Sequence, residues 1–209
     1  MLRTFIFAVL LGVSGAVYAR EVVTEVEVYF LEGSDKMSLW TADNHIEIAR
    51  LYNALSDARN TPGAEILSIV LTSSTAFDSN QERLSGLADN RANALKSIIT
   101  NYMELPVGII TYNTNPQYQW KWLQKAVKNS SLEEKGEIMA VLNLPEDLIE
   151  YKDGNVRDRR INKLMLMNSG TTWENMRKEI FPGMRHAHAT ITVLYNNHSI
   201  EDSPDNILP

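Results

Sequence analysis

Arg91 is the residue whose position in the sequence most clearly suggests chemistry. It lies four residues from each of two leucines on the apolar stripe of a predicted helix. An unpaired guanidinium there would cost several kcal/mol. A polar loop at residues 72–79 precedes this helix, so Arg91 could bind an anionic group of a ligand at the mouth of the loop. The alternative is a structural role with an internal partner, which would be Asp78, Asp89 or the end of a strand.

Two histidines could hold a metal ion. His186 and His188 alternate along a predicted strand and share one face, a spacing that suits chelation. A site would need a third ligand, for which His198 is the candidate. The alternative is a pair of exposed histidines on an edge strand. We predict no bound metal.

Four tryptophans could stack on sugar rings: Trp40, Trp120, Trp122 and Trp173. Trp120 and Trp173 lie on the apolar stripes of predicted helices, so we expect them in a core. Trp122 lies off its stripe and is the better surface candidate. The chain has no glycine-rich phosphate loop, no Gly-x-Ser-x-Gly motif and no sign of a Ser-His-Asp triad. We therefore predict a protein that is not an enzyme and needs no cofactor.

The elements that must position these residues follow a regular order. Apolar and polar residues alternate over 22–31, which predicts a strand with one buried face. Helical spacing follows Asn44, and a continuous aliphatic run predicts a central strand covered on both faces. Ser79 and Glu82 form a capping box that predicts the start of the helix carrying Arg91. The predicted segments are a helix at 44–60, strands at 66–71 and 107–112, and a helix from 79 to about 102. The order strand, helix, strand, helix, strand predicts an α/β sandwich (α+β).

The second half of the chain is predicted to be mainly helical. Apolar residues at helical spacing recur over 116–182, which we interpret as an insertion into the α/β domain, with a turn at Asp153-Gly154. A strand is predicted over 185–195, and the polar tail at 196–209 is expected to be disordered. The expected domain covers 20–195.

Composition and charge exclude several classes of protein. The chain has 209 residues, no cysteine and a net charge of −6. It therefore lacks disulfides and thiol chemistry, and an acidic chain gives no footprint for nucleic acid. Residues 1–19 resemble a signal peptide, with Arg3, an apolar stretch and a cleavage motif ending at Ala19. Cleavage would leave an exported chain of net charge −7 without a membrane-spanning segment.

The stretch Leu87-Ala88-Asp89-Asn90-Arg91-Ala92 resembles a signature of the outer membrane protein A (OmpA) C-terminal domain family. The order of elements, the signal peptide and Arg185 before the last strand extend the resemblance. The helical insertion and the junction at 181–185 resemble a branch common in Bacteroides-type bacteria (Bacteroidota). The resemblance implies a β-α-β-α-β core with a mixed sheet. It also implies a periplasmic location, associated with the outer membrane or the cell wall.

The family resemblance implies that the chain tethers an envelope component to peptidoglycan. The site would hold a diaminopimelate side chain, with Arg91 on its carboxylate and Asp78 on its ammonium. Ser79 at a helix N-terminus and Arg185 would complete it. Two family positions differ, because the usual Asp and Asn fall on Ala76 and Leu84. On this basis Arg91→Ala should weaken wall binding without unfolding, and Ala76→Asp should strengthen it.

The alternative function is a module that binds other envelope proteins or assists the assembly of surface structures such as fimbriae, with a degenerate peptidoglycan site. The state of Arg91 distinguishes the two functions. An accessible Arg91 beside Asp78 favours wall binding, whereas an Arg91 bonded internally favours the interaction module.

Overall fold

The computed structural model describes residues 6–7, 18–77, 86–113, 118–150 and 156–197, and its main feature is a five-stranded sheet. The strand order is β1-β2-β7-β3-β4. β7 is antiparallel to both β2 and β3, whereas β4 is parallel to β3, so the sheet is mixed. The strands are β1 (Ile6–Phe7), β2 (Tyr18–Tyr29), β3 (Ala64–Ser73), β4 (Ile110–Tyr112) and β7 (His186–Asn197).

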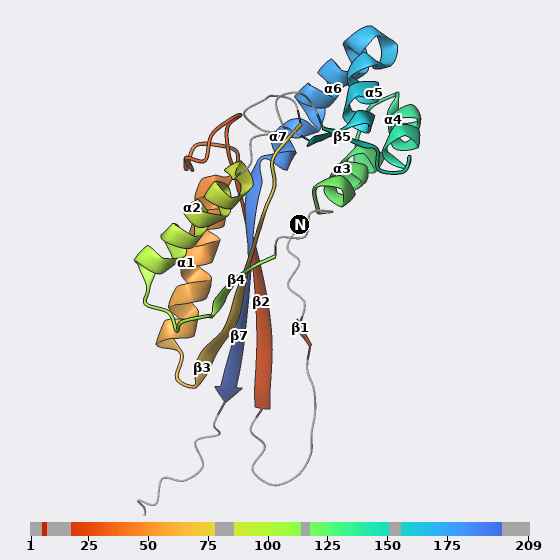
Figure 1. The fold of residues 1–209 in the computed structure, drawn as a ribbon. Coiled ribbons are helices and arrows are strands. Elements are labelled where there is room, and N and C mark those ends of the chain that lie inside the picture. The colour runs from red at the N-terminus through yellow and green to blue at the C-terminus, as the bar shows by residue number, and fades with distance from the viewer. Residues whose placement is uncertain (1–5, 8–17, 78–85, 114–117, 151–155, 198–209) are drawn as a thin grey trace, which may run out of the picture.

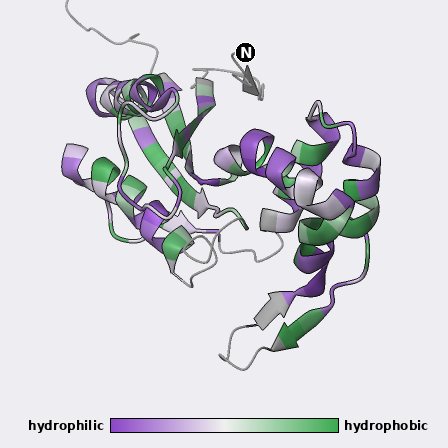
Figure 2. Ribbon diagram, turned by 90° about the horizontal axis from the view of Figure 1, so that it is seen from above, coloured by the Kyte–Doolittle hydropathy of each residue, from purple (hydrophilic) through white to green (hydrophobic). Residues whose placement is uncertain are grey.

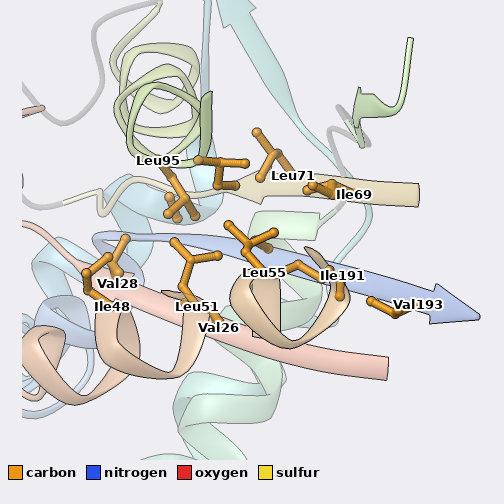
Figure 3. Packing of buried hydrophobic residues seen from close by; sticks show 14 of the residues in the cluster. Val26, Val28, Ile48, Leu51, Leu55, Ile69, Leu71, Leu95, Ile191 and Val193 are labelled. Carbon is orange, nitrogen blue, oxygen red and sulfur yellow. The ribbon is translucent and has the colours of Figure 1, made fainter. Parts of the chain in front are cut away.

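Two helices cover one face of the sheet, α1 (Asn44–Asn60) and α2 (Leu87–Tyr102) (Figure 1). Alternate residues of the strands point toward these helices, because successive side chains of a strand lie on opposite faces. Figure 3 shows the resulting layer, in which Leu51 and Leu55 of α1 pack with strand residues such as Ile191. The predicted α/β sandwich with a mixed sheet is confirmed.

Two local predictions in this part are wrong. The strand at 66–71 was expected to be covered on both faces, but Leu67 is 41% exposed. The pairing of β3 with β7 shifts register between Ile66 and Ser68, so Leu67 lies in a bulge. A continuous helix from residue 79 is also wrong, because Gly86 has a φ of +92° and α2 begins after it. The capping box of Ser79 and Glu82 lies outside the described residues.

The predicted insertion contains most of the remaining elements. Its helices are α3 (Tyr118–Asn129), α4 (Lys135–Leu142), α5 (Arg159–Leu166), a 3-10 turn (Met167–Gly170), α6 (Thr171–Glu179) and α7 (Phe181–Met184). A hairpin of β5 (Leu148–Glu150) and β6 (Val156–Asp158) interrupts them, which periodicity did not reveal. The predicted turn at Asp153-Gly154 lies between these strands, outside the described residues.

The insertion has an apolar core of its own. The helices gather beside the α/β part (Figures 1 and 2), near the end of the sheet where β7 begins (Figure 1). Ala76, in the loop after β3, joins this core and packs with the insertion. A Cβ atom at Gly183 would lie 3.0 Å from the Trp122 ring, so the lack of a side chain lets Trp122 approach the backbone of α7. The core includes Leu123, Ile138, Leu142, Leu164, Met176 and Phe181.

The C-terminal strand is longer than predicted. β7 continues to Asn197, and its pairing with β2 reaches Tyr18. Residues 198–209, which include most of the predicted tail and His198, lie outside the described residues.

Candidate ligand site around Arg91

The Arg91 side chain is completely buried, with 0% of the residue exposed to solvent. Its Nε donates to the carbonyl oxygen of Ser34 at 2.9 Å. Nη1 donates to the carbonyl of Ser74 at 3.1 Å, and Nη2 to that of Leu31 at 3.2 Å. The guanidinium carbon also lies 5.4 Å from the centre of the Phe30 ring. The cation is therefore bonded to main chain from within the protein, as the structural alternative expected of strand ends.

These carbonyls belong to two segments far apart in sequence, which α2 holds together through Arg91. Leu31 and Ser34 follow β2, and Ser74 follows β3. The β3 end is bound on other sides as well: Ser73 Oγ donates to the Ala88 carbonyl at 2.6 Å, and Ser74 Oγ to the Met184 carbonyl at 2.6 Å. Arg91 therefore belongs to a hydrogen-bond network that joins the loops after β2 and β3 to α2 and α7.

The other predicted site residues are placed differently. Asp78 and Ser79 lie outside the described residues. Arg185 is buried at the start of β7, and its Nη2 lies 3.4 Å from Oε2 of Glu32. Its carbonyl accepts a hydrogen bond from the Phe30 amide at 2.7 Å. Arg185 is therefore close to the loop that Arg91 binds, and both arginines bond to residues that immediately follow β2.

His186 is buried, which corrects the expectation of an exposed edge-strand histidine. β7 lies in the centre of the sheet, and α3 covers the ring, with Trp122 5.7 Å away. Nδ1 lies 2.8 Å from the Gly183 carbonyl, and since a carbonyl only accepts, Nδ1 carries the hydrogen. Nε2 lies 3.6 Å from Oε1 of Glu27. Burial lowers the pKa of His186 below its usual 6.5, and the nearby Glu27 carboxylate opposes this shift.

Metal binding by the two histidines gains no support from the described residues. Among them, no group of three or more His, Cys, Asp or Glu side chains could hold a metal ion. The proposed third ligand, His198, lies outside this part of the chain.

The tryptophans divide by environment. Trp173 is buried in the insertion core, as predicted. Trp120 is partly buried between Phe77 and Arg160, and Trp122 is partly buried against His186, so Trp122 is not a free surface ring. Trp40 is 90% exposed in the loop before α1.

Arg160 is a buried residue that holds several parts of the insertion together, and the sequence analysis did not identify it. Its Nε lies 3.0 and 2.9 Å from the two carboxylate oxygens of Asp158, and Nη1 donates to the Leu144 carbonyl at 3.0 Å. The guanidinium carbon lies 4.0 Å from the centre of the Trp120 ring. The available signal was Asp158 two residues ahead of Arg160, because Asp is a preferred N-cap and its side chain accepts from the Arg160 amide.

No protein-family model matches this chain, and no curated protein matches it either. Among solved structures, the chain is similar to the OmpA-like domain of FopA1 from Francisella tularensis subsp. tularensis SCHU S4. The similarity covers 93% of this chain and 84% of that chain, at 10% sequence identity and a TM-score of 0.39. Within the described residues, none of the helices combines the length and apolar character needed to cross a membrane.

Proposed function

We propose that this chain is a non-enzymatic, exported module of the cell envelope that binds another protein. The observation that carries the proposal is the state of Arg91, whose buried guanidinium donates to carbonyls of Ser34, Ser74 and Leu31. In this proposal Arg91 is a structural residue, and residues 20–195 form one domain with 116–182 as its insertion.

Binding of a ligand carboxylate by Arg91 would disturb this network. A carboxylate that bound the guanidinium would take a donor from the buried carbonyl of Ser74 and from the partly buried carbonyl of Ser34. Each such group costs about 1–3 kcal/mol when it is left unsatisfied. The ligand would also need a path to a side chain that has no solvent-exposed surface. Both considerations favour the interaction module over the peptidoglycan tether.

The tether remains the competing proposal, and its residues are Arg91, Asp78, Ser79 and Arg185. Arg91 occupies the arginine position of the six-residue stretch that resembles the OmpA signature. This resemblance, with the Bacteroides-type insertion, is what supports peptidoglycan as the partner.

A pulldown with purified peptidoglycan sacculi separates the two proposals. The protein isolated from the envelope fraction is mixed with sacculi of the diaminopimelate type and sedimented. We expect the wild type to stay in the supernatant. Arg177→Ala is a matched control, because the Arg177 side chain is 38% exposed on α6, where its Nη1 lies 3.4 Å from Oε1 of Glu174.

Sedimentation of the wild type and of Arg177→Ala, but not of a folded Arg91→Lys protein, would overturn the interaction module and establish the tether. Arg91→Lys keeps the positive charge, so it is the variant that retains the best chance of folding. Asp78→Asn gives a second, independent variant, since the tether assigns the ligand ammonium to Asp78.

A further inference from the structure

The outer edge of β2 is the longest strand edge in the described sheet. β2 spans Tyr18–Tyr29 and pairs with β7 along its whole length on one side. On its other side, the one described strand is β1, which pairs only Ile6 with Val22 and Phe7 with Glu21. A strand edge of this kind presents backbone N–H and C=O groups to any extended chain that approaches it.

Side chains of α1 close one end of this edge. The Tyr29 amide donates to Oδ1 of Asn44 at 2.7 Å, and Nδ2 of Asn44 donates to the Tyr29 carbonyl at 2.9 Å. The Glu27 amide donates to Oε2 of Glu47 at 3.2 Å. These two side chains therefore bond the backbone in the positions that a neighbouring strand would take.

The same hydrogen bonds show which residues of β2 direct their backbone groups toward the outer edge. The amides of Glu27 and Tyr29 face outward, whereas the amide of Phe30 donates inward to the Arg185 carbonyl. Alternate residues of a strand face the same edge. Val23 and Glu25 therefore also face outward, and so does Glu21, which β1 contacts. The edge from Glu21 to Glu25 is thus the part that α1 leaves uncovered.

The side chains along this edge differ between the two faces. Glu21, Glu25 and Glu27 lie on the face away from the helices, since their cross-strand partners are Leu194, Thr190 and His188. Glu21 and Glu25 are exposed. On the helix side, the edge carries the aliphatic side chain of Val22, on the same face as buried Val26. An added strand that alternates cationic and aliphatic residues would match both faces, because opposite charges on facing residues of neighbouring strands attract.

We infer that the β2 edge from Glu21 to Glu25 binds an extended segment of a partner protein as an added antiparallel strand. The segment places Lys or Arg opposite the glutamates and aliphatic residues on the helix side. β1 occupies one end of this position in the full chain, and the predicted cleavage after Ala19 would remove it. The inference rests on the proposed function, in that it names the surface through which the module binds protein.

The probe is the labelled peptide Ac-KIKIKI-NH2, titrated by fluorescence anisotropy against protein isolated from the envelope fraction, with its N-terminus determined by mass spectrometry. Lysines opposite Glu21 and Glu25 in antiparallel pairing would direct their amides at β2. Peptides N-methylated on all lysines should therefore bind at least about tenfold more weakly. Peptides N-methylated on all isoleucines should bind like the parent, because those amides face away.

Two protein variants test the position of the site. Glu25→Lys should weaken binding by about tenfold. Glu65→Lys is the matched control, because exposed Glu65 lies on the same sheet face but on β3, with β7 between it and β2. Val23→Pro should also weaken binding, and thermal melting shows whether each variant is folded. The N-methylated pair gives its answer with wild-type protein, so the test does not depend on any variant.

The inference is overturned if the parent peptide does not bind, if both N-methylated peptides bind equally, or if Glu65→Lys weakens binding as much as Glu25→Lys. It is also overturned if the isolated protein retains residues 1–19 and binds no peptide, since β1 is then the resident strand. Sacculus sedimentation is measured on the same samples. Protein that binds sacculi through Arg91 and also binds the peptide contradicts the proposed function but keeps the edge site. Protein that binds neither contradicts the edge site alone.

Discussion

Arg91 is a buried cation that donates hydrogen bonds to main-chain carbonyls of two loops. Removing its side chain would leave the carbonyls of Leu31, Ser34 and Ser74 short of donors and open a cavity beside Phe30. We therefore expect Arg91→Ala to lower the free energy of unfolding by about 3–5 kcal/mol. Urea denaturation followed by circular dichroism measures this change. The ligand-facing role that the family resemblance implies predicts instead that Arg91→Ala weakens wall binding without unfolding the domain.

The control for this prediction is Arg177→Ala, a partly exposed arginine of α6, which should change stability by about 0.5 kcal/mol or less. An Arg91→Ala protein as stable as Arg177→Ala would contradict the structural role of Arg91.

His186 gives stability a defined dependence on pH. Its pKa in the folded protein is lowered from 6.5, mainly by burial. The unfolded chain therefore binds a proton at a higher pH than the folded one, and stability is lost as the pH falls below 6.5 toward the lowered value. His186→Asn should show a flatter pH dependence, because an amide can still donate to the Gly183 carbonyl but does not titrate. Urea midpoints from about pH 8 to about pH 5 test this.

The matched variant is His45→Asn, since His45 is an exposed histidine of α1. It should retain the wild-type pH dependence. Glu27, His188 and Arg91 also act on the His186 ring, so the comparison of the two variants isolates the contribution of His186. If the urea midpoints of all three proteins changed with pH in the same way, His186 would not be the group responsible for the loss of stability at low pH.

At the scale of the element, the loop after β3 packs into the insertion core through Ala76. The family resemblance suggested that an Asp at position 76 would face a ligand. Ala76 is instead 1% exposed and packs in the insertion core. We expect Ala76→Asp to destabilise the protein by about 2–4 kcal/mol, because a carboxylate would be buried among apolar side chains. Thermal or urea unfolding measures this loss.

Ala140→Asp is the control for this substitution, because Ala140 is exposed on α4 of the same insertion. It should cost about 1 kcal/mol or less, from helix propensity alone. If Ala76→Asp were as stable as the wild type and bound a diaminopimelate stem peptide in calorimetry, the loop would form a ligand pocket after all.

At the scale of the whole molecule, the testable feature is the start of the mature chain. Cleavage after Ala19 would remove β1 and leave the ladder between β2 and β7 from Arg20, opposite Tyr195, to Tyr29, opposite His186. We expect mass spectrometry of the envelope fraction to find Arg20 as the first residue. A cytoplasmic protein that begins at Met1 would contradict both the export prediction and the proposed function.

Local pattern alone was sufficient for the elements that have one buried face. The alternation of Val26 and Val28 with glutamates revealed β2, and Leu51 and Leu55 revealed α1, because burial on one side imposes the period of the element on the sequence. The stripe containing Arg91 likewise revealed that this arginine lies near the core. The sequence alone also excludes disulfides, because it has no cysteine, and its acidic net charge argues against a basic nucleic-acid surface.

Tertiary structure decided what each of these residues contacts. Nothing in the sequence places β7 at the centre of the sheet, so the burial of His186 could not be foreseen. Arg91 donates to backbone carbonyls of Ser34 and Ser74. Every residue has a backbone carbonyl, so residue types cannot identify these acceptors. The uncovered edge of β2 could not be predicted either, because it also consists of backbone groups. Backbone groups of Val23 and Glu25 become a binding surface only because the fold leaves them at an edge and because Asn44 and Glu47 close the rest.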